Sequence, residues 1–153
     1  NLGDGTFNAT AFHAAGGKFG VGSDSNVLIG IADELRQYEY SQRLKHRARN
    51  VLAENEGSTG RALFDGAVTG GNIAMGRAGD GLKMGASADF VALDTARLPH
   101  AKGDGVLDSW IFGGRASVND VWVRGVKQVE GGQHRLRDEA ERAFQKAIGE
   151  LLD

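Results

Sequence analysis

The eight residues Lys18–Ser25, KFGVGSDS, constrain the fold of this chain more than any other stretch. They predict a short buried strand, Lys18–Asp24, because a nearly continuous run of apolar and small residues is typical of a parallel strand covered on both faces. In parallel sheets and barrels, the loops at the carboxyl ends of the strands form the functional face. Asp24 is therefore the first candidate functional residue. An Asp after a strand is also a common turn residue or helix cap.

The composition limits the classes of partner and of chemistry. The 153 residues carry a formal net charge of -2, which gives no basic surface for nucleic acid or for an anionic membrane. The absence of cysteine excludes disulfides and thiolate metal sites, and no apolar run is long enough to cross a bilayer. We expect a cytoplasmic protein. The start at Asn1 without methionine and the 24 glycines, which suit many tight strand–helix connections, favour a piece of something larger over a complete single domain.

Apolar residues at helical spacing predict three helices in the first half of the chain. The pair Gly16-Gly17 is expected to end the first helix, and the pair Gly70-Gly71 to interrupt the third, which Ser58 or Thr59 would cap. The second has a thin apolar stripe among many charges, which favours a place on the surface or against a partner subunit. The predicted helices are Phe7–Ala15, Ile31–Asn50 and Arg61–Val68.

The character of the sequence changes near Gly79. Short alternating runs beyond it predict antiparallel strands, and apolar residues at helical spacing near the end predict a further helix, Leu136–Leu152. We therefore expect three parts, at residues 1–78, 79–134 and 135–153. The predicted strands are Asp89–Leu93, Trp110–Phe112, Val118–Val123 and Lys127–Glu130.

No complete catalytic or metal-binding motif stands in the sequence. The histidines are scattered, and none pairs at a spacing such as His-x-His. The glycine-rich stretches Gly3–Gly5 and Gly79–Gly85 lack the Lys-Ser/Thr of a phosphate-binding P-loop and favour ordinary turns. A Ser/His/Asp triad around Ser23 has no nucleophile-elbow sequence to support it. The four histidines are His13, His46, His100 and His134.

Four motifs must be taken together. The most specific are NLGDG at Asn1–Gly5, GSDS at Gly22–Ser25 and ELRQYEYSQRL at Glu34–Leu44; GASADFVALD at Gly85–Asp94 is more widely shared. With them, essentially the whole chain resembles the C-terminal third of the amidohydrolase superfamily, and within it the formimidoylglutamate deiminase family. The resemblance implies the last part of a (β/α)8 barrel with Lys18–Asp24 as its eighth strand, half of a small β-sandwich domain and a C-terminal helix.

The resemblance also implies a catalytic role for Asp24. Members hold one divalent metal, usually zinc, and Asp24 would bind it, accept a proton from the attacking water and pass the proton to the departing ammonia. The other metal ligands would come from the N-terminal remainder of the same enzyme, so this chain alone is expected to be inactive. A homodimer is also expected. Support of Asp24 is expected from Ser23 and Ser25, and contact with substrate from Asn1, Asp4 and Asn26.

The reaction implied by the resemblance is hydrolysis of N-formimino-L-glutamate to N-formyl-L-glutamate and ammonia, a step of histidine degradation. Two alternatives stay open. The first is another deaminase or a chlorohydrolase of the same superfamily. The second is a non-catalytic interaction domain, in which the helix Ile31–Asn50 is the docking surface and Asp24 is only a cap.

Overall fold

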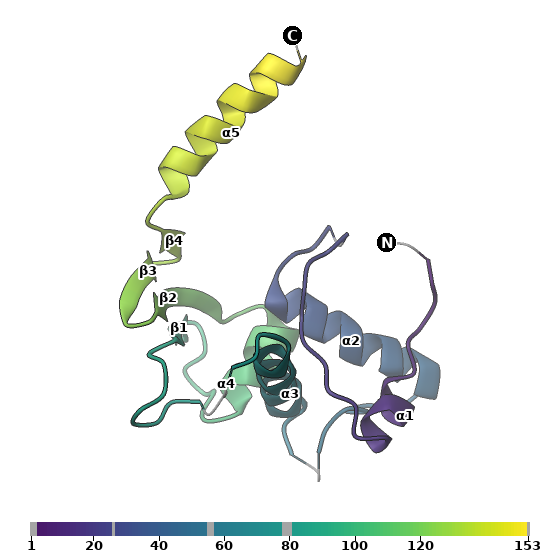
Figure 1. The fold of residues 1–153 in the computed structure, drawn as a ribbon. Coiled ribbons are helices and arrows are strands. Elements are labelled where there is room, and N and C mark those ends of the chain that lie inside the picture. The colour runs from purple at the N-terminus through teal and green to yellow at the C-terminus, as the bar shows by residue number, and fades with distance from the viewer. Residues whose placement is uncertain (1–2, 26, 55–56, 78–80, 153) are drawn as a thin grey trace. The chain divides into compact units, whose positions relative to one another are not determined.

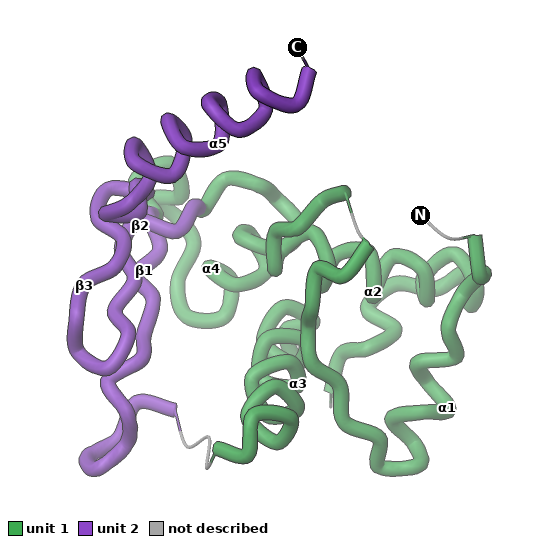
Figure 2. Tube along the Cα trace, turned by 45° about the horizontal axis from the view of Figure 1, so that its top comes forward, with its two compact units in different colours: residues 1–80, 95–116 green, residues 81–94, 117–153 purple. Residues whose placement is uncertain are grey.

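The computed structural model describes residues 3–25, 27–54, 57–77 and 81–152. The chain forms two compact units, each made from two separate stretches of sequence (Figure 2). Unit 1 comprises residues 1–80 and 95–116, and unit 2 comprises residues 81–94 and 117–153. Residues 95–116 therefore pack with the helices that precede them in the sequence, whereas the sequence grouped them with the strands.

Unit 1 is helical, and it confirms the three helices predicted in the first half of the chain (Figure 1). The hydroxyl of Ser58 accepts a hydrogen bond from the backbone N–H of Arg61 (2.9 Å) and so caps the third helix as expected. The second helix ends at His46 rather than at Asn50, because Arg47 adopts a left-handed backbone with φ of 52°. These helices are α1 (Ala9–Ala14), α2 (Ile31–His46) and α3 (Thr59–Ala74).

The core of unit 1 is formed by Leu35 of α2, Leu63 of α3 and Ile111. Ile111 lies in η1 (Ser109–Gly113), a π-helical turn that directly follows the short helix α4 (Gly105–Asp108). The predicted strand Trp110–Phe112 is therefore wrong. Three consecutive apolar residues have no period of their own, and here the helical turn buries the Ile111 side chain while its carbonyl accepts a hydrogen bond from the guanidinium of Arg36.

The pair Gly70-Gly71 does not interrupt α3, which continues through it to Ala74. The reason is packing against the extended segment that precedes Asp24. A Cβ atom at Gly70 would overlap the backbone carbonyl of Phe19, and one at Gly66 would lie 2.6 Å from the Phe19 ring. Glycine is needed at these positions for the close approach of two backbones, and the sequence signal was mistaken for a helix break.

The segment Lys18–Asp24 is not a strand, and it is not buried as predicted. Within the described residues it has no sheet partner, and Val21, Gly22 and Asp24 are exposed. A strand forms only when its backbone N–H and C=O groups pair with a neighbouring strand. None of the described strands pairs with this segment, and the apolar run lies extended beside α3.

Unit 2 contains a four-stranded antiparallel sheet in the order β1-β2-β3-β4. Arg124 and Gly125 both have positive φ and form the two-residue hairpin loop between β2 and β3. The Phe90 and Trp122 rings stack across the first strand pair, 4.6 Å apart. Three of the predicted strands are thus confirmed, and β4 is new. The strands are β1 (Phe90–Asp94), β2 (Ser117–Val123), β3 (Val126–Glu130) and β4 (Gln133–His134).

The predicted terminal helix is confirmed as α5 (Arg137–Leu152) in unit 2. Every described residue of α5 is exposed, including Phe144, Leu151 and Leu152 of its apolar face.

None of the helices in the described part of the chain has both the length and the apolar character that a membrane span requires.

Candidate functional site

Asp24 lies in an exposed turn at the end of the segment that packs on α3. Its φ of 36° is in the left-handed region, which Asp tolerates better than most residues. The hydroxyl of Ser25 donates a hydrogen bond to Asp24 Oδ1 over 3.5 Å. Ser23, directly before the turn, is also exposed. Asp24 is thus a solvent-exposed residue and not part of the core of unit 1.

Of the remaining predicted site residues, Asp4 lies within the part of the chain that the structure describes. Asp4 is exposed, in the loop before α1. Asn1 and Asn26 lie outside the described residues. The structure therefore brings Ser25 to Asp24, whereas no contact between Asp4 and Asp24 is recorded among the residues it describes.

The loop with Asp4 is anchored to α2 through Gln42. The side chain of Gln42 is fully buried, and its amide oxygen accepts a hydrogen bond from the backbone N–H of Ala9 (3.3 Å). Its NH2 group donates to the carbonyl of Phe7 (2.9 Å) and to the hydroxyl of Ser41 (3.0 Å). The Gln42 side chain thus fixes the backbone at residues 7–9, where the Asp4 loop ends and α1 begins.

The segment that leads to Asp24 is anchored through Phe19. Its ring lies 4.9 Å from the Tyr38 ring of α2 and 5.5 Å from the His13 ring of α1, measured between centroids. The Tyr38 hydroxyl and His13 Nε2 are hydrogen bonded at 3.0 Å, and burial raises the pKa of Tyr38. Aromatic contacts of this kind fix ring positions as well as burying area. Both candidate segments are therefore held by α2.

A third anchor on α2 is Glu39, whose side chain is fully buried. Its carboxylate accepts hydrogen bonds from the backbone N–H groups of Val51 (3.0 Å) and Leu52 (2.9 Å) and from Arg43 Nε (2.6 Å). A buried carboxylate needs this many partners to offset the cost of leaving water. Glu39 thus fixes the loop that follows α2.

Sequence reasoning did not single out Glu39 or Gln42, because it treated the polar residues of this helix as a solvated face. The available signal was spacing. Leu35, Glu39 and Gln42 are separated by four and three residues, so they lie on one face of the helix, and Leu35 marks that face as buried.

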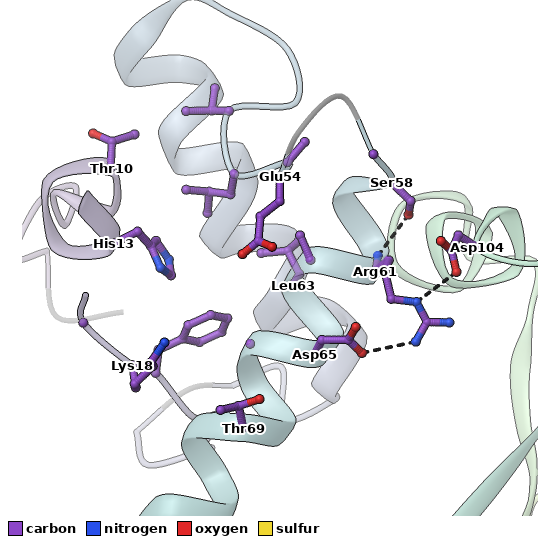
Figure 3. A pocket seen from close by; sticks show the side chains of 18 residues that line it. Thr10, His13, Lys18, Glu54, Ser58, Arg61, Leu63, Asp65, Thr69 and Asp104 are labelled. Atoms are coloured by element: carbon purple, nitrogen blue, oxygen red, sulfur yellow. Dashed lines mark hydrogen bonds and ion pairs between the residues drawn. The ribbon is translucent and has the colours of Figure 1, made fainter. Parts of the chain in front are cut away.

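Two hollows of unit 1 adjoin the candidate segments, and a further one, of about 530 Å³, is lined by residues 97–115. The smaller of the two that adjoin the segments, about 240 Å³, is lined by residues of both candidate segments and of α2, including Phe7, Gly22 and Glu34. The larger, about 680 Å³, is shown in Figure 3. There Arg61 is hydrogen bonded to Asp104 (2.9 Å) and Asp65 (3.1 Å), which raises the pKa of Arg61 and ties up its charge. Neither hollow is lined by Asp24 or Asp4.

The described residues do not by themselves form a metal site. Among the described residues, no three His, Cys, Asp or Glu side chains come together in a way that would hold a metal ion. A protein site for zinc uses three or four side chains. The exposed carboxylate of Asp24 has the chemistry of one such ligand, so it fits a metal site whose other ligands come from outside this chain.

No family model matches the chain. Over its whole length it is 45% identical to formimidoylglutamate deiminase from Pseudomonas aeruginosa, covering 35% of that protein. A crystal structure of an amidohydrolase from Brucella melitensis matches with a TM-score of 0.95 and 86% sequence identity, over all of this chain and 34% of the other. The chain is related to the amidohydrolases.

A more distant match is the 5-methylthioadenosine/S-adenosylhomocysteine deaminase of Bacillus cereus, at 28% identity over 94% of this chain and 33% of that protein. The chain thus spans about one third of the length of the curated relatives it matches. The resemblance predicted from the four motifs is confirmed. So is the expectation that the chain corresponds to a segment of a larger amidohydrolase.

Proposed function

We propose that this chain is the C-terminal segment of a metal-dependent amidohydrolase that removes the formimino nitrogen of N-formimino-L-glutamate. The observation that carries the proposal is the 45% identity over the whole chain to a formimidoylglutamate deiminase, with Asp24 in an exposed GSDS turn. The reaction adds water to the C=N carbon and yields N-formyl-L-glutamate and ammonia. The place of this step in histidine degradation follows from the same resemblance.

Asp24 is the residue of this chain that would hold the metal, and we take the metal to be zinc. When bound, such an ion supplies Lewis-acid activation of water. The carboxylate of Asp24 accepts a proton from the attacking water and releases it to the departing nitrogen, which leaves as ammonia. The Ser25 hydroxyl, which donates to Asp24 Oδ1, helps to orient the carboxylate for both steps. The Asp4 loop is assigned to substrate, together with Asn1 and Asn26.

In the complete enzyme, the segment Lys18–Asp24 would be the eighth strand of a (β/α)8 barrel. Its extended, apolar and exposed backbone supports this assignment, because a strand from the rest of the enzyme would pair with it and cover it. The TM-score of 0.95 against one third of a larger amidohydrolase supports it as well, since the chain has the backbone arrangement of a part of that protein. We assign β1–β4 to half of the small β-sandwich and expect a cytoplasmic homodimer.

The test is ammonia release by the full-length protein that carries this chain, with N-formimino-L-glutamate as substrate. The variant Asp24→Asn is expected to lower kcat by about 10³-fold, because it removes the proton acceptor. The control is Asp138→Asn on the exposed face of α5, which is expected to be neutral.

A second candidate reaction is the deamination of 5-methylthioadenosine or S-adenosylhomocysteine, which the match at 28% identity favours. Turnover of these nucleosides, with none of N-formimino-L-glutamate, would select it. If the full-length protein turned over neither class of substrate, the interaction-domain hypothesis would be favoured instead.

A further inference from the structure

Gln42 is a buried polar residue that the reaction does not use. All three of its side-chain hydrogen bonds are to groups within the fold, and two of them reach the backbone of Phe7 and Ala9, more than thirty residues earlier in the sequence. A side chain of this kind costs free energy to bury unless its partners are in place. The structure therefore has a specific connection between the middle of α2 and the end of the Asp4 loop.

This connection matters because the loop has little else to fix it. Gly3–Thr6 are exposed, and within the described residues they take part in no hydrogen bond or ion pair. Among the described residues of this loop, the first to form a hydrogen bond is Phe7, whose carbonyl accepts from Gln42; the buried Ala9 follows. The position of Asp4 therefore depends on where Gln42 holds the backbone that follows it.

The same helix also fixes the other candidate segment. Tyr38 lies four residues before Gln42, so the two side chains leave the same face of α2 one turn apart. Tyr38 contacts Phe19 and hydrogen bonds His13, and Phe19 is joined to Asp24 by only a short extended stretch. Gln42 and Tyr38, on one face of α2, thus fix the backbone positions of the Asp4 loop and of the segment that leads to Asp24.

We propose that Gln42 is a positioning residue. It fixes the position of the Asp4 loop relative to the Asp24 turn, so that one substrate molecule can contact both. The proposal rests on the proposed function for its effect on catalysis. Its structural part, that Gln42 fixes the loop around Asp4, can be measured without any substrate. Gln42 itself need not touch the substrate.

The experiment uses the full-length protein and two variants of nearly the same size as the native residue. Gln42→Glu keeps an acceptor for the Ala9 N–H but loses the donor to the Phe7 carbonyl, and Gln42→Met loses both. The matched control is Gln37→Glu, the same change at an exposed position of the same helix. The readouts are amide hydrogen exchange of peptides covering residues 3–9 and 19–25, and kcat and KM for N-formimino-L-glutamate.

We expect exchange of the Ala9 amide, whose N–H donates to Gln42, to rise at least tenfold in Gln42→Met and less in Gln42→Glu, with residues 19–25 changed less and the control unchanged. We expect KM to rise more than kcat falls, because loss of loop position weakens substrate contact before it affects the Asp24 carboxylate. Unchanged exchange in residues 3–9, or an equal rise throughout α2 and α3, would overturn the positioning role.

The kinetic readout separates this proposal from the proposed function. If the native protein has no deiminase activity, the proposed function fails, and the exchange readout alone decides whether Gln42 fixes the loop. If the native protein is active and the loop loosens in the variants while KM stays constant, the positioning role in catalysis is wrong although the proposed function stands.

Discussion

At the scale of single residues, the buried carboxylate of Glu39 leads to a prediction about stability. We expect Glu39→Gln to lower the free energy of unfolding by about 2 kcal/mol. Both carboxylate oxygens of Glu39 accept hydrogen bonds, so the NH2 group of glutamine would place a donor against another donor, either a backbone N–H or the Arg43 guanidinium. The measurement is urea unfolding of the full-length protein. Glu141→Gln, on the exposed α5, is the control and is expected to change the midpoint little. Equal stability of both variants would mean that the Glu39 hydrogen bonds contribute nothing net.

The residues of the candidate site were predictable to different degrees. Asp24 could be proposed from the sequence because a carboxylate after an apolar run is a local pattern, and because GSDS is a motif of the family that the chain resembles; its role stays a prediction. Glu39 and Gln42 were not found, because their importance depends on backbone groups far away in the sequence, at Val51 and at Phe7. A helix that carries many charges looks solvated until those partners are in place.

At the scale of elements, the contact between α3 and the extended segment before Asp24 gives a second prediction. Gly70→Ala is expected to destabilise the protein by about 1–3 kcal/mol, because its Cβ atom would overlap the Phe19 carbonyl and force the two backbones apart. The neighbouring Gly71→Ala is the control, since a Cβ atom there meets no atom within 4 Å. That change is expected to stabilise α3 by up to about 1 kcal/mol.

Thermal unfolding of both variants measures this difference. We also expect Gly70→Ala to lower activity, because Phe19 precedes Asp24 by five positions and the displaced backbone would carry the carboxylate with it. The prediction is wrong if the two alanine variants have the same melting temperature.

The elements that the sequence predicted correctly are those with local signals. The helix Arg137–Leu152 and the strands beside the Arg124-Gly125 turn have a clear period and a clear turn, and these do not depend on distant contacts. The errors at Trp110–Phe112 and at Gly70-Gly71 have the opposite cause. In both cases the local pattern was compatible with two structures, and packing of Ile111 into the core or of Phe19 against Gly70 decided between them.

At the scale of the whole molecule, many large apolar side chains of the described residues are exposed in both units. In unit 1 the stretch 27–31 is the main example, with Val27 at 79% and Ile29 at 72% of full exposure. In unit 2 the apolar face of α5 is another, with Phe144 at 64%. The chain matches only about one third of its relatives' length. If the proposed function is right, the remainder of the enzyme would cover both surfaces.

We therefore predict that the 153-residue chain, expressed alone, self-associates and binds a hydrophobic dye. When it is co-expressed with the N-terminal remainder of the enzyme, we expect a one-to-one complex that binds little dye. Size-exclusion chromatography with mass detection and dye fluorescence measure both states.

Within the complex, Phe144→Ser is expected to weaken association at least tenfold, because it leaves an aromatic-sized void in the interface, whereas Gln145→Ser beside it is expected to be neutral. A monomeric, dye-free chain would instead favour an independent interaction domain, since the exposed surfaces would then be tolerated without the rest of an enzyme.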